Sequence, residues 1–132
     1  MKPGDTGEAS FVVGPQHSAR MVRIDAGDDY PDVFGTWSLV ALMENAAARA
    51  MKGLLGPGRL SVGVHINTSH LAATSIGAKV RAKATFLRQE GKIYHFKVEA
   101  FDQGGLIGEG EHARAIVDSE RLVNGALSRN QL

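Results

Sequence analysis

The sequence predicts an α+β domain in which an antiparallel sheet of five to six strands wraps around one long central helix. The first observation is a helical pattern between Phe34 and Leu55 that stops at a Gly-Pro-Gly sequence. The second is a series of four later segments that alternate apolar and polar residues and are joined mostly by tight turns. The apolar face of such a sheet must be covered, and the helix is the only cover available.

The helix is predicted from the period of its apolar residues. They recur at helical spacing at Val40, Met43, Ala47, Ala50, Met51 and Leu54. Alanine, leucine and methionine dominate the stretch, and these residues favour helix. About twenty residues at a rise of 1.5 Å each give a rod of roughly 30 Å, which is long enough to form the centre of a small domain.

Two short strands are expected before the helix, at Phe11–Val13 and Ala19–Ile24, followed by a loop over residues 25–32 with four aspartates. Strands are expected after the helix at residues 59–71, 78–89, 93–102 and 106–117. In the first of these, Thr68 and His70 share the parity of apolar residues, so they face the helix if no bulge intervenes.

We expect the whole chain, residues 1–132, to form a single domain with loose termini at residues 1–10 and 118–132, although a short helix also fits residues 118–132. The net charge of +1 gives no case for nucleic-acid binding, and no apolar run is long enough for a membrane span. The chain has no cysteine, which excludes disulfides and thiolate metal sites and fits a cytoplasmic protein. No spacing of histidines or carboxylates predicts a metal site or another cofactor.

Glu44 is the one charged side chain in the middle of the predicted helix, and no oppositely charged residue lies three or four positions away. It is either a carboxylate at the helix edge that reaches water, or a partly buried carboxylate kept for chemistry. Thr36 fits an N-cap as well as a catalytic role. His70 alone fits a hydrogen-bonded core histidine better than a proton carrier, and Gly63 alone fits a twist or bulge in a strand.

These residues occur in short motifs that together resemble one known family. The motifs are VFGT at 33–36, LME at 42–44, SVG at 61–63, TSHLAAT at 68–74 and GEHARA at 110–115. In this combination they resemble the fluoroacetyl-CoA thioesterase family of single-domain hydrolases with the hot-dog fold, from about residue 11 to residue 117.

The resemblance implies a catalytic triad of Thr36, Glu44 and His70. It also implies that the backbone N–H of Gly63 meets the thioester carbonyl. Outside the resemblance, His112 and Arg114 share strand parity, and Arg114 is placed to hold the carboxylate or a CoA phosphate, although a structural role fits both residues better. The resemblance further implies a homodimer with acyl-CoA sites at the subunit interface, without deciding whether dimers pair into tetramers. Coenzyme A is then part of the substrate, and no separate cofactor is expected.

The loop before the helix departs from the family pattern. The fluoroacetyl-specific member has two phenylalanines there, whereas this chain has Gly27 and Tyr30. Trp37 also replaces a small residue after the catalytic threonine. Tyr30 and Trp37 are therefore expected to shape the acyl pocket, and we expect a short or medium acyl-CoA as substrate, without fluoroacetyl specificity.

Two alternatives remain open at this stage. A hot-dog enoyl-CoA hydratase typically pairs an aspartate with a histidine, and no such pair is visible in the sequence. A non-catalytic acyl-CoA binding module would keep Gly63 and the pocket without turnover.

Overall fold

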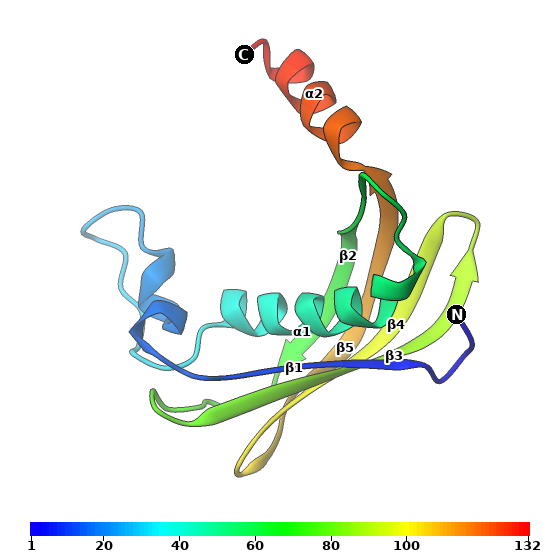
Figure 1. Ribbon diagram of the computed structural model, residues 1–132. Coiled ribbons are helices and arrows are strands. Elements are labelled where there is room, and N and C mark those ends of the chain that lie inside the picture. Colours follow the sequence, from blue (N-terminus) through cyan, green and yellow to red (C-terminus); the bar gives the residue numbers. More distant parts are fainter.

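The computed structural model describes residues 1–132 as one curled antiparallel sheet around a central helix (Figure 1). The strands are β1 (Thr6–Val12), β2 (Arg59–His70), β3 (Lys79–Glu90), β4 (Ile93–Asp102) and β5 (Gly105–Asp118). They are arranged in the order β1-β3-β4-β5-β2, so β1 and β2 form the two edges of the sheet. The predicted architecture is therefore present, with five strands.

The helix α1 (Thr36–Met51) lies in the concave side of the sheet and is followed by a 3-10 turn, η3 (Lys52–Leu54). Its buried residues include Leu39, Leu42, Met43 and Ala46, which are at most 1% exposed. They pack against alternate residues of β3 and β4, such as Val80, Ala82, Phe96 and Val98. This core fixes the helix against the sheet, and with it every side chain that the helix presents.

A β-bulge at Val64 changes the predicted faces of β2. Gly63 pairs with Arg114 and His65 pairs with Ala113, so Val64 has no partner of its own on β5. Strict alternation cannot place Gly63 and His70 on one face, because they are seven residues apart. The extra residue reverses the parity within the strand, and both residues therefore face α1.

Two segments differ from the sequence prediction near the N-terminus. Ala19–Val22 forms a 3-10 helix, η2, instead of a strand, because the hydroxyl of Ser18 accepts a hydrogen bond from the backbone of Arg20. Residues 6–10, expected to be loose, belong to β1 and pair with β3. Gly7 allows this pairing close to the helix, since a Cβ there would run into the backbone of α1.

The C-terminal segment, for which the sequence fits loose structure or a short helix, forms a second helix, α2 (Ser119–Asn130). The side chain of Asp118 caps it by accepting a hydrogen bond from the backbone of Arg121. The helix projects away from the body of the domain (Figure 1) and has no buried residue. None of the helices is both long and apolar enough to cross a membrane.

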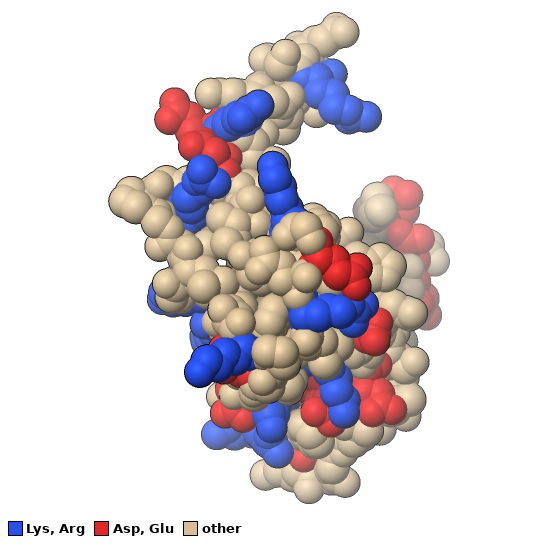
Figure 2. All heavy atoms as spheres, turned by 90° about the vertical axis from the view of Figure 1, so that its right-hand side faces the viewer, with Lys and Arg blue, Asp and Glu red and all other residues tan.

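The face shown in Figure 2 carries basic and acidic side chains side by side. On β3, the guanidinium of Arg81 lies over the ring of Phe101, 4.3 Å from the ring centroid. On β4, Lys97 lies 3.8 Å from Glu99. These charged side chains contact their neighbours and reach water, as expected on an exposed sheet face.

Candidate active site

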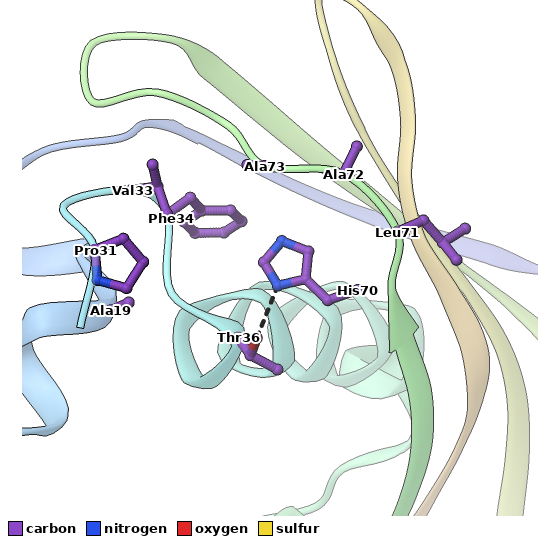
Figure 3. A pocket seen from close by; sticks show the side chains of 9 residues that line it. All are labelled: Ala19, Pro31, Val33, Phe34, Thr36, His70, Leu71, Ala72 and Ala73. Carbon is purple, nitrogen blue, oxygen red and sulfur yellow. Dashed lines mark hydrogen bonds between the residues drawn. The ribbon is translucent and has the colours of Figure 1, made fainter. Parts of the chain in front are cut away.

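A pocket of about 410 Å³ opens where the N-terminus of α1 meets the end of β2 (Figure 3). It is lined by Ala19, Pro31, Val33, Phe34, Thr36, His70, Leu71, Ala72 and Ala73. The segment between η2 and α1 supplies one wall, and the turn after β2 supplies the other. Two polar side chains in an otherwise apolar pocket suit a ligand with an apolar group and one reactive centre.

Those two polar side chains are hydrogen bonded to each other. Thr36 Oγ1 lies 2.8 Å from His70 Nδ1 (Figure 3). Gly35 takes the N-cap position, so Thr36 is the first helical residue and its hydroxyl is free to serve His70. The pair therefore joins the start of the helix to the last residue of β2.

The surroundings of His70 favour its neutral form. Burial lowers the pKa of His70, while the backbone of Ala72 acts weakly in the opposite direction. The second ring nitrogen, Nε2, is buried and has no hydrogen-bond partner. The ring of Phe34 lies edge-on to the imidazole, with 6.2 Å between the ring centroids. A neutral imidazole can accept the proton of the Thr36 hydroxyl.

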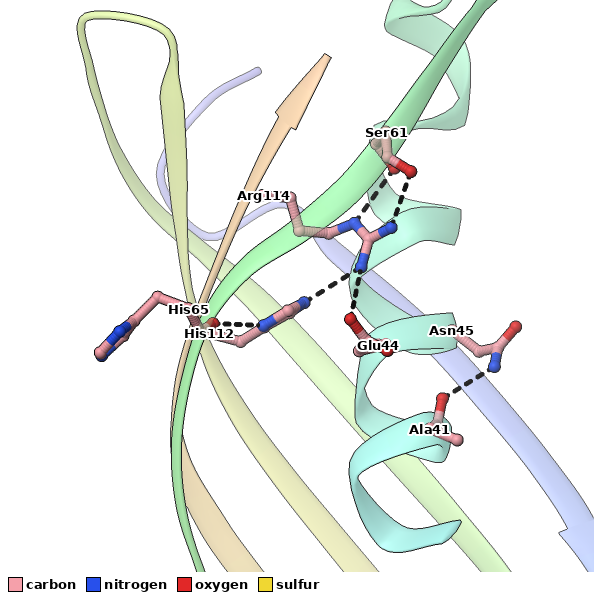
Figure 4. A network of polar contacts seen from close by, with 7 residues as sticks. All are labelled: Ala41, Glu44, Asn45, Ser61, His65, His112 and Arg114. Carbon is pink, nitrogen blue, oxygen red and sulfur yellow. Dashed lines mark hydrogen bonds and ion pairs between the residues drawn. The ribbon is translucent and has the colours of Figure 1, made fainter. Parts of the chain in front are cut away.

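A second polar cluster lies about two turns further along the helix, around Glu44 (Figure 4). Glu44 Oε1 is 3.5 Å from Nη1 of Arg114, whose side chain is only 7% exposed. The Glu44 side chain itself is 41% exposed, so both readings of this carboxylate hold in part: it reaches solvent and is paired with a buried cation.

Arg114 is fixed by β2 and β5 rather than by Glu44 alone. Its Nε donates to Ser61 Oγ at 3.1 Å, and its Nη2 donates to the Ser61 carbonyl at 2.9 Å. Its Nη1 lies 3.1 Å from His112 Nε2, and His112 Nδ1 lies 2.7 Å from the His65 carbonyl. Burial lowers the pKa of both His112 and Arg114, and the nearby Glu44 carboxylate acts in the opposite direction on each.

Gly63 faces the Glu44 carboxylate across the gap between strand and helix. A Cβ at this position would overlap Glu44 Oε1 and would lie 3.1 Å from His112 Cε1. The glycine thus leaves room for the carboxylate and for any group that approaches it. From the sequence alone, Gly63 fitted a twist or bulge in the strand. A bulge does follow at the next residue, and the absence of a side chain at Gly63 also makes room for Glu44.

The structure brings the predicted residues together in two groups. Thr36 and His70 form one group, while Glu44, Gly63 and Arg114 form the other. Eight residues separate Thr36 from Glu44, which corresponds to about 12 Å along the helix axis. Within one chain, therefore, Glu44 is not in contact with the Thr36–His70 pair.

Tyr30 and Trp37, predicted to shape the acyl pocket, do not line it. Tyr30 is 42% exposed, and the neighbouring Pro31 takes the place in the wall. Trp37 is 40% exposed and donates from Nε1 to the Ser18 carbonyl at 3.0 Å, which ties the segment before the helix to α1.

Sequence reasoning missed Ser61 and gave His112 a structural role. The parity of His112 and Arg114 on one strand was visible, but their depth was not. His112 is 2% and Arg114 6% exposed, although both types are seldom so buried. No group of three histidine, cysteine or acidic side chains is arranged to hold a metal ion.

Comparison with known proteins shows the family of this chain. The model of the fluoroacetyl-CoA-specific thioesterase family matches residues 15–120. The fluoroacetyl-CoA thioesterase of Streptantibioticus cattleyicolor is 36% identical over 124 residues, which cover 92% of this chain and 89% of that protein. The chain belongs to the fluoroacetyl-CoA-specific thioesterase family.

Solved structures agree with this assignment. A fluoroacetyl-CoA-specific thioesterase variant in complex with fluoroacetate and CoA superposes with a TM-score of 0.87 at 35% identity, covering 92% of this chain and 99% of that one. A thioesterase superfamily member from Thermus thermophilus gives a TM-score of 0.83 at 27% identity, covering 98% and 92%. A hot-dog-like protein from Thermanaerovibrio acidaminovorans gives 0.81 at 21% identity, covering 98% and 93%.

The predicted hot-dog fold and the predicted family are thus confirmed, and the protein is a thioester hydrolase. In this family member the helix N-terminus holds a threonine–histidine pair, and the helix middle holds a glutamate beside a buried arginine.

Proposed function

We propose that this thioesterase hydrolyses a short or medium acyl-CoA at a site made of Thr36, Glu44 and His70 from two subunits of a homodimer. The observation that carries the proposal is the 2.8 Å contact between Thr36 Oγ1 and His70 Nδ1 inside an apolar pocket. A hydroxyl paired with a neutral imidazole is a suitable unit for moving protons at a reacting carbonyl.

Glu44 supplies the carboxylate that attacks the thioester carbonyl or activates the water that does so. If Glu44 attacks, the C–S bond breaks as a mixed anhydride of the acyl group and Glu44 forms, and water then hydrolyses this anhydride. If Glu44 activates water, the acyl group passes to water directly as the C–S bond breaks. Both routes give the free acid, and the CoA thiolate takes up a proton. His70 is suited to shuttle that proton, because burial lowers its pKa and favours the neutral ring, which can take up a proton and pass it on. Gly63 has no side chain that would displace the Glu44 carboxylate.

The position of β2 supports a site built from two subunits. This strand is an open edge of the sheet, and open edges are suited to pairing with a second copy. An antiparallel pairing centred between Gly63 and His70 would place Gly63 of one subunit opposite His70 of the other. The Glu44 cluster of one chain would then face the Thr36–His70 pair of its partner.

The acyl pocket is small and apolar. It has a volume of about 410 Å³, and the side chains of Pro31, Val33, Phe34 and Leu71 form part of its walls. A short or medium acyl chain fits such a lining. The relative from Streptantibioticus cattleyicolor is named for fluoroacetyl-CoA, and fluoroacetyl-CoA therefore belongs among the substrates to be tested.

The test is release of free thiol from a panel of acyl-CoA esters, with the parent protein and Glu44→Gln measured side by side. The panel runs from acetyl, fluoroacetyl and propionyl esters to phenylacetyl and medium straight-chain esters. Turnover that is lost in Glu44→Gln supports the proposal and ranks the substrates. Equal turnover by the two proteins would contradict the role of Glu44.

The two alternatives, a binding module and an enoyl-CoA hydratase, are distinguished by calorimetry and by adding crotonyl-CoA to the panel. A binding module would bind the esters in calorimetry and leave them intact. An enoyl-CoA hydratase would consume crotonyl-CoA without releasing thiol.

A further inference from the structure

The guanidinium of Arg114 is held mainly by neutral acceptors, although a carboxylate lies next to it (Figure 4). Three of its hydrogen bonds, at 2.9–3.1 Å, go to Ser61 Oγ, the Ser61 carbonyl and His112 Nε2. The contact with Glu44 is longer, at 3.5 Å, and involves one oxygen. Glu44 takes part in an ion pair but in no hydrogen bond.

The bonding pattern also fixes the tautomer of His112. Its Nδ1 lies 2.7 Å from the carbonyl oxygen of His65, which can only accept, so Nδ1 must carry the hydrogen. In the neutral ring, Nε2 then has a lone pair, and it accepts the hydrogen bond from Nη1 of Arg114. The ring is 2% exposed, so water does not compete for either nitrogen.

This arrangement prevents the usual pairing of an arginine with a carboxylate. Such pairs are frequently bidentate, with two parallel N–H···O bonds. Here the edge formed by Nε and Nη2 is taken by Ser61, and one N–H of Nη1 goes to His112. Glu44 therefore meets Nη1 alone, through Oε1 at 3.5 Å. A carboxylate in a bidentate pair would have its lone pairs occupied and would be a poorer nucleophile or base.

We propose that Ser61 and His112 are positioning residues that hold Arg114 beside Glu44 and occupy the guanidinium edge that would form a bidentate pair, so that the Glu44 carboxylate stays free to react. This inference rests on the proposed role of Glu44 in hydrolysis. It gives a function to one buried histidine and one strand serine that the threonine, glutamate and histidine triad leaves unexplained.

The kinetic test compares Ser61→Ala, His112→Leu and His112→Gln with the parent. The first two variants free Arg114 to turn towards Glu44, and we expect kcat to fall about tenfold or more while KM changes little. Glutamine offers Arg114 a carbonyl oxygen in place of Nε2, so His112→Gln should recover much of the lost kcat. Ser10→Ala on β1, at the other edge of the sheet, and His95→Gln on β4, opposite Ala113 and on the other face of the sheet from His112, are matched controls and should retain the parent values.

The second measurement does not depend on activity. In ¹H–¹⁵N NMR spectra of the parent, His112 should be the tautomer with hydrogen on Nδ1, and the Arg114 Nε–H should exchange slowly with water. In Ser61→Ala, exchange of the Arg114 Nε–H should become faster. Thermal unfolding shows which variants are folded, and Ser61→Ala carries the kinetic test if His112→Leu does not fold.

The outcomes separate the two proposals. Parent-like kcat in folded Ser61→Ala and His112→Leu, or hydrogen on Nε2 of His112, would overturn the positioning role. If the parent hydrolysed no ester while the NMR signals were as expected, the proposed function would fail and the positioning role would fail with it, although the geometry of Arg114 would stand.

Discussion

Thr36 Oγ1 and His70 Nδ1 lie 2.8 Å apart, although 34 positions separate the two residues in the sequence. The contact depends on two features of the fold. Gly35, and not Thr36, caps the helix, which leaves the threonine hydroxyl free. The bulge at Val64 turns the end of β2 so that His70 faces the helix.

Removing the hydroxyl of Thr36 should therefore remove activity with little effect on the fold. Valine has nearly the same shape, and we expect Thr36→Val to lower kcat by about 100-fold or more, the usual contribution of a positioned proton-transfer group. Thr36→Ser keeps the hydroxyl and should retain far more activity. Thiol release together with thermal unfolding checks this, and parent-like turnover by Thr36→Val would rule out the hydroxyl.

The pH dependence of kcat/KM should reflect the buried imidazole of His70. Burial lowers the pKa of His70 from 6.5, and the neutral ring is the form that can accept a proton from Thr36. Activity should therefore persist below pH 6.5 and be lost only as the pH falls through the lowered pKa. A profile that lost activity above pH 6.5 would show that another group controls the acid limb.

Protein stability should fall over the same range, since burial also lowers the pKa of His112. The unfolded chain takes up protons near pH 6.5 and the folded chain does so only at lower pH, so the free energy of unfolding decreases as the pH is lowered below 6.5. His112→Gln removes one of these groups. The pH dependence of its unfolding, followed by denaturant titration, should be weaker than that of the parent, and an unchanged dependence would contradict the buried neutral His112.

Much of the fold could be predicted because its signals are local. The alternation of Val80, Ala82, Ala84 and Phe86 on β3 predicted the face that packs on the helix, and all four are buried. The helix was predicted from its apolar period and its glycine and proline stop, and α1 with η3 covers most of that stretch. The four strands after the helix were likewise found within a few residues of their bounds.

Other features depend on contacts that local patterns do not contain. The segment Ala19–Val22 has the composition of a strand, but the Ser18 hydroxyl, which donates to Asp32, and the Ser18 carbonyl, which binds Trp37, hold it as a 3-10 turn. The bulge at Val64 leaves no mark in the alternation of β2.

The same limit applies to the site. Thr36, Glu44, Gly63 and His70 were predicted jointly from motif spacing. Their division into two groups could not be predicted, because it depends on the course of β2 along α1 and on the bulge at Val64. The depth of Arg114 and His112 follows from the curl of the sheet around α1, which the sequence does not express.

Gly63 should tolerate no side chain if Glu44 is to react. The Cβ of Gly63→Ala would displace the Glu44 carboxylate, and a misplacement of about 1 Å can cost about 100-fold in rate. The loss of stability should be small, since the atom displaced belongs to the end of a flexible side chain. Gly53→Ala, which adds a Cβ in open space, is the matched control. Equal kcat for the two variants would contradict a reactive Glu44 next to Gly63.

The two-subunit site can be tested by mixing inactive chains. Glu44→Gln and His70→Ala should each be inactive as homodimers. If Glu44 of one subunit works with His70 of the other, a mixed dimer has one site with both changes and one intact site, so random mixing should restore about a quarter of the parent activity. If all three residues came from the same subunit, every site in the mixed dimer would carry one change, and mixing would restore nothing. The chains are mixed by co-refolding, and each variant refolded alone is the control. Light scattering shows whether the mixture is dimeric, and a dimeric mixture without activity would refute the composite site.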